Sequence, residues 1–173
     1  MRTQQKTWAP LRSLAIVIAA LLLAAPASAE KKAVGRFKDW AVFTETVDGE
    51  LICYAATEAT SKAPSRANHG AVWYYVTSWK SGKATNQPSL KTGFNFKDGS
   101  SPKAKVGRSS WTLFPAGPEL FAENEDDPAI VSALRSGASL TVEGTSARGT
   151  SVSYKFSLSG SATAIDKAAE ACR

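Results

Sequence analysis

The sequence predicts an all-β fold, an antiparallel β-sandwich or barrel-like domain with one short internal helix and a C-terminal helix. About seven short segments are rich in β-branched and aromatic residues or alternate in polarity, as strands do. Turn-forming residues separate them roughly every 8–15 positions, which is typical of sandwiches and barrels. No strand-like segment alternates with a long helix, so a parallel sheet is not expected.

The first 29 residues are predicted to be a secretory signal peptide. A basic start and an apolar run of 12 residues (14–25) precede an A-x-A cleavage site, with cleavage expected before Glu30. Such a run spans about 18 Å as a helix, too short for a hydrocarbon core of about 30 Å. We therefore expect a single β-rich domain at residues 30–173, with no transmembrane segment after cleavage and a periplasmic, outer-membrane-associated or secreted location.

The predicted strands are separated by clear turn signals. Asp48-Gly49 is a strong hairpin signal, Gly107 is interpreted as a bulge within one strand, and Arg148-Gly149 marks a late hairpin. Residues 58–70 and 81–89 are predicted to be loops. The predicted strands are, in order, residues 38–46, 51–57, 71–80, 90–97, 105–114, 119–123, 139–145 and 151–158.

Two helices are predicted late in the chain. In the first, Asp126 or Asp127 can cap the N-terminus, Pro128 suits the first helical position and Gly137 can end the helix. The second, at residues 162–172, has one apolar stripe at i, i+3, i+4 and i+7. The stripe consists of Ile165, Ala168, Ala169 and Cys172.

Cys53 and Cys172 are the only two cysteines. An oxidising compartment favours a disulfide between them, and the alternative is a pair of buried free thiols. The bond would close a loop of about 120 residues and contribute on the order of 4–5 kcal/mol in the chain-entropy model.

Charge is unevenly distributed along the chain. The whole chain carries 21 basic and 15 acidic residues, whereas residues 30–173 keep 18 and 15, a net charge of +3. Between Lys62 and Arg108 nine basic residues stand against one acid, interleaved with aromatic residues. An anionic envelope or host-surface component is one partner that fits, and nucleic acid is not expected in an exported protein. The alternative is a solvated face on which lysines keep a sheet edge soluble.

The sequence contains no motif for catalysis, a cofactor or a metal. One histidine excludes zinc motifs that need two, and His69 is predicted to be an exposed loop residue. The acidic cluster at residues 123–127 suits either calcium or helix capping, and the Asp-Asp-Pro context favours capping.

Five short motifs resemble the invasion-associated locus B family of Gram-negative exported proteins. The resemblance covers essentially the whole predicted mature domain. Its most specific parts are the G-T-S-A-R-G-T hairpin and the S-L-S-G ending before the last helix. The motifs are FKDWAV (37–42), LICYAA (51–56), LRSG (134–137), VEGTSARGT (142–150) and YKFSLSG (154–160).

The resemblance implies an all-β exported domain at the periplasm or outer membrane. Some members are linked to host-cell entry, and the family provides no catalytic residues. Many members have further cysteines in the middle of the domain, and this chain has none there.

We therefore expect a non-enzymatic cell-envelope protein that acts by binding. The alternatives are a periplasmic ligand carrier or hydrolase with an unrecognised site, and an assembly partner of outer-membrane proteins. The candidate contact residues are Arg148, Lys83, Lys91, Lys105 and Arg108.

Overall fold

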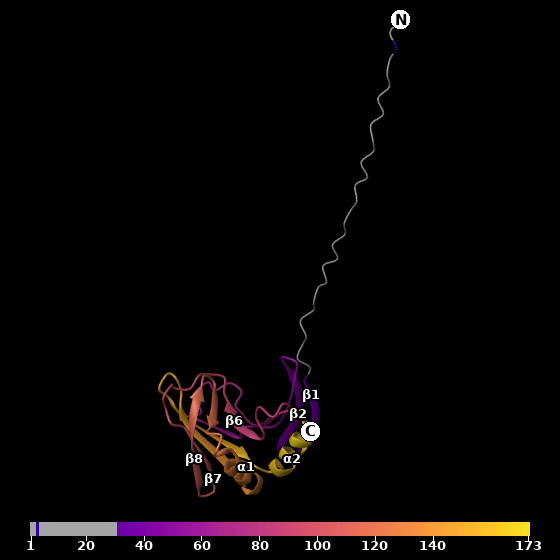
Figure 1. Ribbon diagram of the computed structural model, residues 1–173. Coiled ribbons are helices and arrows are strands. Elements are labelled where there is room, and N and C mark those ends of the chain that lie inside the picture. Colours follow the sequence, from indigo (N-terminus) through magenta and orange to yellow (C-terminus); the bar gives the residue numbers. More distant parts are fainter. Residues whose placement is uncertain (1–2, 4–30) are drawn as a thin grey trace.

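In the part of the chain that the structure describes, eleven antiparallel strands form one sheet, accompanied by two helices, which confirms the predicted all-β fold (Figure 1). The structure, a computed structural model, describes Thr3 and residues 31–173, so the predicted signal segment lies outside the described residues except for Thr3. The elements are β1 (Lys32–Phe37), β2 (Trp40–Val47), β3 (Glu50–Glu58), β4 (Ser61–Ala63), β5 (Trp73–Trp79), β6 (Gln87–Lys91), β7 (Lys103–Val106), β8 (Ser109–Ala116), β9 (Glu119–Ala122), α1 (Asp127–Ser136), β10 (Ser139–Thr145), β11 (Ser151–Ser157) and α2 (Ser161–Ala171).

The sheet curls round on itself through residues 50–63. The strand order is β1-β2-β3-β5-β6-β9-β8-β7-β10-β11-β4, and only two residues separate β3 from β4. The backbone N–H of Ala59 donates to Val72 (2.9 Å), beside β5, and the N–H of Thr60 donates to Lys155 (2.7 Å) on β11. Because one segment pairs with β5 and then with β11, the sheet closes into a barrel-like shape, and the β1–β2 hairpin extends beyond it.

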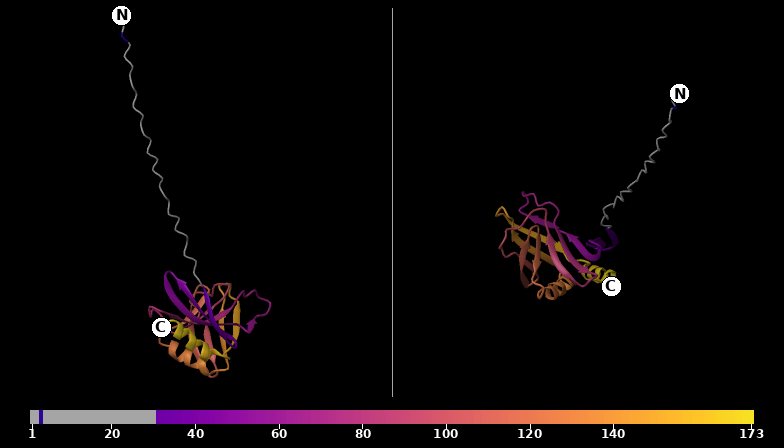
Figure 2. Two further views of the ribbon diagram at one scale, coloured as in Figure 1. Left: turned by 90° about the vertical axis from the view of Figure 1, so that its right-hand side faces the viewer. Right: turned by 45° about the horizontal axis from the view of Figure 1, so that its top comes forward.

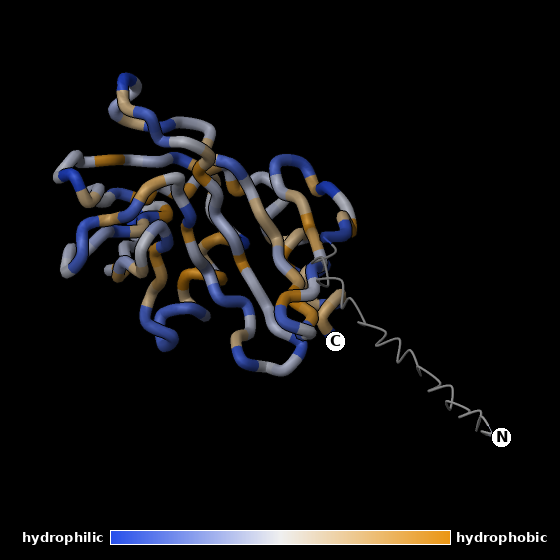
Figure 3. Tube along the Cα trace, turned by 90° about the horizontal axis from the view of Figure 1, so that it is seen from above, coloured by the Kyte–Doolittle hydropathy of each residue, from blue (hydrophilic) through white to orange (hydrophobic). Residues whose placement is uncertain are grey.

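The core fills the inside of this curled sheet. Alternate residues of the strands point inward, and Figure 3 shows hydrophilic residues gathered at the turns. Trp40 and Val42 on β2 and Ala55 on β3 are fully buried. The Trp40 indole N–H donates to the carbonyl of Ser157 at 3.0 Å, so the largest core side chain also has its polar atom paired.

Both helices pack at one end of the sheet, side by side (Figures 1 and 2). Helix α2 contacts β2 and β3 and buries Ala164, Ile165 and Ala168, three residues of one helical face. The structure contains the predicted disulfide between Cys53 on β3 and Cys172, which follows α2. The bond therefore fastens the end of the chain to the inner face of the sheet.

Gly160 sits where the chain turns from β11 into α2. Its φ is +92°, and a Cβ there would lie 2.0 Å from the carbonyl oxygen of Phe37. Only glycine satisfies both the left-handed conformation and this close approach. The contact holds the start of α2 against the turn between β1 and β2, where the N–H of Asp39 donates to Ser159 at 3.2 Å.

Several predicted boundaries are wrong. The strand predicted at 105–114 is two strands, because Gly107 (φ +58°) makes a tight turn rather than a bulge. The strand predicted at 90–97 is β6, which begins earlier and ends at Lys91. The short strands β1 and β4 were not predicted, because their Lys, Arg and Gly residues give no alternation and tertiary pairing alone defines them.

Among the described residues, neither helix has the length and apolar character needed to cross a membrane.

The disulfide generates a stability prediction. Cys172→Ser removes a cross-link between residues 119 positions apart, so the free energy of unfolding should fall by about 4–5 kcal/mol. Chemical denaturation of the wild-type and variant proteins measures this difference. Without reductant the native wild-type protein should not react with iodoacetamide, and alkylation of both cysteines in that state would contradict the assignment.

Candidate functional site

The outer face of the sheet carries a second set of large side chains that the core does not use. Along β5 the burial pattern alternates strictly, with Tyr74, Val76 and Ser78 buried and the residues between them half-buried. Alternation places the half-buried residues on the outer face. This strand thus places aromatic side chains on both faces of the sheet.

An aromatic row crosses the outer face from β2 to β8. Phe43 and Tyr54 are register partners with ring centroids 5.6 Å apart, and Tyr54 lies 5.7 Å from Tyr75. On the other side of β6, Phe121 and Phe114 are register partners with centroids 6.1 Å apart. Phe114 is 41% exposed, a high value for a large apolar side chain. The strand register thus continues the row across six strands.

A hollow of about 310 Å³ lies in the middle of this face, and we call it the outer hollow. Tyr54 and Tyr75 line it with Trp79 and Phe121. Ile52 adds a further apolar side chain, and the polar part of the lining comes from four strands, namely Glu45, Thr77, Gln87, Ser89, Lys91 and Glu119. The site therefore combines flat apolar surfaces with hydrogen-bonding groups, as small-molecule sites do.

The charged groups of the outer hollow are paired. The Tyr54 hydroxyl donates to Glu45 Oε2 at 3.1 Å, and Lys91 Nζ lies 2.9 Å from Glu119 Oε1. Burial, together with the hydrogen bond to Glu45, raises the pKa of Tyr54, and burial followed by the nearby carboxylates raises that of Tyr75. Both hydroxyls therefore stay protonated and can donate a hydrogen bond.

Two lysines lie over aromatic rings of the outer face. Lys31 Nζ lies 4.2 Å from the ring centroid of Phe43, and Lys83 Nζ lies 4.9 Å from the ring of Trp79. Both distances are within the range of cation–π attraction.

The structure does not bring the five predicted contact residues into one patch. Lys91 lines the outer hollow, whereas Lys83 lies outside it and contacts the ring of Trp79. Lys105 is paired with Glu143 at 2.7 Å, and Arg108 is exposed in the turn between β7 and β8. Arg148 is exposed in the β10–β11 turn and lines another hollow of about 540 Å³. Their role in binding stays a prediction.

The aromatic residues of the outer hollow were not predicted as site residues. The signal lay in residues 73–79, where aromatic side chains occupy both alternating faces. A strand with one solvated face does not need both.

Residues 40–169 match the family model described as invasion associated locus B (IalB) protein. The chain belongs to this family. The match covers most of the chain, including the strands that form the outer hollow, helix α1 and all but the last two residues of α2. The IalB family is linked to invasion and is not a known enzyme family. No curated protein and no solved structure matches the chain.

The prediction that His69 is exposed is wrong for this IalB domain. Its side chain is buried, because the loop after β4 folds back over β11. His69 Nε2 lies 2.8 Å from the carbonyl oxygen of Pro64, and Nδ1 lies 3.0 Å from the Tyr154 hydroxyl. Since a carbonyl only accepts, Nε2 carries a proton and donates to Pro64, and Nδ1 is paired with the Tyr154 hydroxyl. Both ring nitrogens are thereby used in holding the loop.

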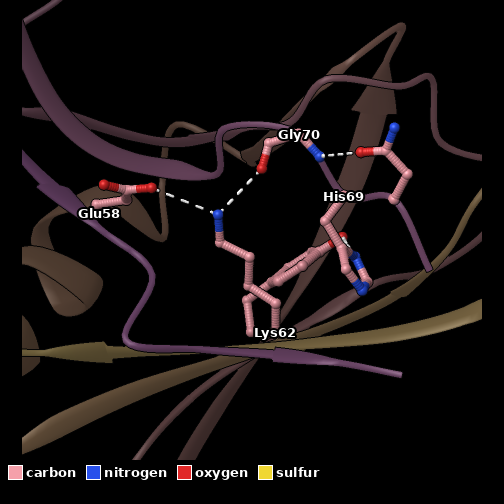
Figure 4. A network of polar contacts seen from close by, with 6 residues as sticks. Glu58, Lys62, His69 and Gly70 are labelled. Atoms are coloured by element: carbon pink, nitrogen blue, oxygen red, sulfur yellow. Dashed lines mark hydrogen bonds and ion pairs between the residues drawn. The ribbon is translucent and has the colours of Figure 1, made fainter. Parts of the chain in front are cut away.

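Lys62 holds the same loop from its other side (Figure 4). Its Nζ donates to the carbonyl of Gly70 at 3.0 Å and lies 3.4 Å from Glu58 Oε1. His69 and Lys62 therefore have structural partners that account for their positions.

The acidic residues at the start of α1 do not cap the helix through their side chains. Asp126 is the N-cap but has helical dihedral angles (φ −84°, ψ −21°), whereas a capping side chain needs extended backbone. Asp127 is buried, and its Oδ1 has no hydrogen-bond partner among the described residues. No group of His, Cys, Asp and Glu in the described part of the chain is suited to hold a metal ion.

The His69 contacts predict a stability effect. His69→Ala leaves the buried Tyr154 hydroxyl and the Pro64 carbonyl without their partner, which should lower the free energy of unfolding by about 2–4 kcal/mol. Urea denaturation measures the loss. Arg66→Ala, in the same loop but exposed, is the control and should stay within about 0.5 kcal/mol of wild type. Equal midpoints for wild type and His69→Ala would show that the contacts do not hold the loop.

The burial of Asp127 predicts a pH effect. Burial, and to a lesser degree Asp126, raises the pKa of Asp127 from 3.8 to about 6. The folded state thus binds a proton more tightly than the unfolded state, so this carboxyl lowers stability as pH rises from about 4 to 6, and the full cost remains above that.

Asp127→Asn cannot ionise, so it should be more stable than wild type at pH 7.5 by on the order of 2 kcal/mol and about equal at pH 4. Thermal melts across this range measure the difference. Asp126→Asn is the control, since Asp126 is less buried and its charge is the smaller of the two causes that raise the pKa of Asp127. A constant difference between wild type and Asp127→Asn at all pH values would contradict the assignment.

Proposed function

We propose that this chain is an exported, non-enzymatic cell-envelope protein that binds a partner in the outer hollow. The observation that carries the proposal is the aromatic row on a face of the sheet that the core does not need. Exposed aromatic side chains beside hydrogen-bonding groups are the usual composition of binding sites.

Two features support export. Residues 1–29 have the three-part pattern of a secretory signal peptide. The only two cysteines are bonded to each other, and such a bond persists in an oxidising compartment such as the bacterial periplasm.

The charges of the outer hollow support binding rather than catalysis. Glu45 accepts a hydrogen bond from Tyr54, and Glu119 is paired with Lys91. A general acid needs a carboxyl that holds its proton near neutral pH and is free to reach a reacting atom. These two carboxylates are instead engaged by Tyr54 and Lys91.

A second candidate is attachment to an anionic envelope or host surface through the basic residues. Arg108 and Arg148 favour it, because both are exposed and neither forms an ion pair within the described residues. They lie at the turns of two different hairpins, whereas the outer hollow gathers its groups in one place.

Fractionation of cells that express the full chain with a C-terminal tag tests the proposal. We expect the protein in the periplasmic and envelope fractions, in a form about 29 residues shorter than the chain. Tyr75→Ala removes a ring from the outer hollow and should move the protein from the washed envelope to the soluble periplasm. Trp73→Ala is the matched control, since Trp73 is a half-buried aromatic residue on the same strand and face but outside the hollow.

Each result discriminates between the candidates. Recovery in the cytoplasm overturns export, and equal envelope retention of Tyr75→Ala and Trp73→Ala overturns the role of the outer hollow. Release by the double charge reversal Lys105→Glu/Arg108→Glu, but not by Tyr75→Ala, would select the anionic-surface candidate instead.

A further inference from the structure

We infer that the outer hollow binds an uncharged saccharide chain. The inference rests on the proposed function and names the chemical class of its partner. A sugar ring has an apolar C–H face and a rim of hydroxyl groups. A site for it therefore needs flat apolar surfaces with hydrogen-bond donors and acceptors beside them.

The apolar surfaces are the aromatic rings. Tyr75 and Trp79 stand on β5 and Phe121 on β9, all half-buried, so each ring is held by packing and still offers surface to a ligand. Held rings lose little side-chain entropy when a ligand stacks on them. The register places Ser89, which has a small side chain, between Tyr75 and Phe121, and this leaves room for the hollow between the rings.

The donors and acceptors are polar side chains of the lining. Thr77, Gln87 and Ser89 line the outer hollow, and their side chains form no hydrogen bond among the described residues. A hydroxyl and an amide each donate and accept, so they suit sugar hydroxyl groups, which do the same. The Tyr75 hydroxyl, which stays protonated, adds another donor.

Other ligand classes fit this lining less well. A lipid chain or an apolar peptide would cover three unpaired polar side chains and leave them unsatisfied, at about 1–3 kcal/mol each. An anionic polymer would meet two carboxylates, Glu45 and Glu119, against one ammonium group, Lys91. An uncharged ligand that is polar at its rim has neither difficulty.

The length of the aromatic row fits a chain rather than a single sugar. The row runs from Phe43 on β2 to Phe114 on β8 and crosses six neighbouring strands. At about 4.8 Å between strands, that distance is roughly 24 Å. Several linked sugar rings can lie along it, with the outer hollow in the middle.

Isothermal titration calorimetry tests the inference on the disulfide-bonded protein purified from the periplasm of expressing cells. The probes are four neutral hexasaccharides, chitohexaose, cellohexaose, maltohexaose and mannohexaose, with dextran sulfate as the anionic comparison. We expect saturable binding of at least one hexasaccharide, stronger than binding of dextran sulfate and unchanged in Trp73→Ala.

Tyr75→Ala should weaken this binding by at least about tenfold, as expected for an anchoring aromatic side chain. Ser89→Lys fills the hollow without removing a core residue and should weaken it by a similar factor. A thermal melt of each variant tests whether it is folded. If Tyr75→Ala does not fold, the binding measured with Ser89→Lys tests the inference.

The outcomes separate the inference from the proposed function. If no hexasaccharide binds, or if neither variant weakens binding, the saccharide inference is overturned. If Tyr75→Ala nevertheless leaves the envelope fraction while Trp73→Ala stays, the proposed function stands and the partner belongs to another class. If neither assay responds to Tyr75→Ala, both are wrong.

Discussion

The double pairing of residues 50–63 is the constraint on which the rest of the structure depends. One stretch of backbone satisfies its hydrogen bonds first with β5 and then with β11, and this pairing turns a long sheet into a closed one. The closed sheet encloses an interior of fixed volume. The strand residues pointing inward and the two helices fill that volume with buried apolar side chains, so no further aromatic side chain is needed inside.

The aromatic row on the outer face is therefore a surplus, that is, a set of apolar side chains beyond those that fill the core. Strand β5 illustrates it, because its inward residues Tyr74 and Val76 belong to the core while Tyr75 and Trp79 stand on the opposite side. A strand whose outer side only met solvent would carry polar residues there. The same surplus recurs on β2, β8 and β9, and the strand register aligns the rings into one row. The alignment of rings from strands far apart in the chain is the observation on which the proposed binding role rests.

Local signals in the sequence were sufficient for most of the fold. The alternation in residues 38–46, the aromatic and β-branched residues in 71–80, and the Asp-Gly and Arg-Gly turns predicted strands and hairpins that the structure contains. Features set by tertiary contact were not predictable in this way. Gly107 forms a turn because β7 and β8 pair with each other, and His69 is buried because its loop meets Tyr154, 85 residues further along the chain.

The candidate site is another feature set by tertiary contact, so local sequence signals did not predict it. Basic residues attract attention in a sequence because they cluster along the chain, yet the fold distributes Lys105, Arg108 and Arg148 over separate turns and strands. Tyr54, Tyr75 and Phe121 are far apart in the sequence and meet only because β3, β5, β6 and β9 are neighbours. Which face of a strand points outward is decided by sheet closure, and periodicity alone does not report it.

The disulfide and the outer hollow are connected through two adjacent residues. Cys53 points inward from β3 to the end of α2, and Tyr54, the next residue, points outward into the hollow. The bond fixes the inner side of the strand to the C-terminal end of the chain. Because consecutive strand residues turn together, the orientation of the Tyr54 ring and of its partner Glu45 is fixed as well. Rigid binding-site residues lose less entropy when a ligand binds, so under the proposed function the cross-link would support the site as well as the stability of the fold.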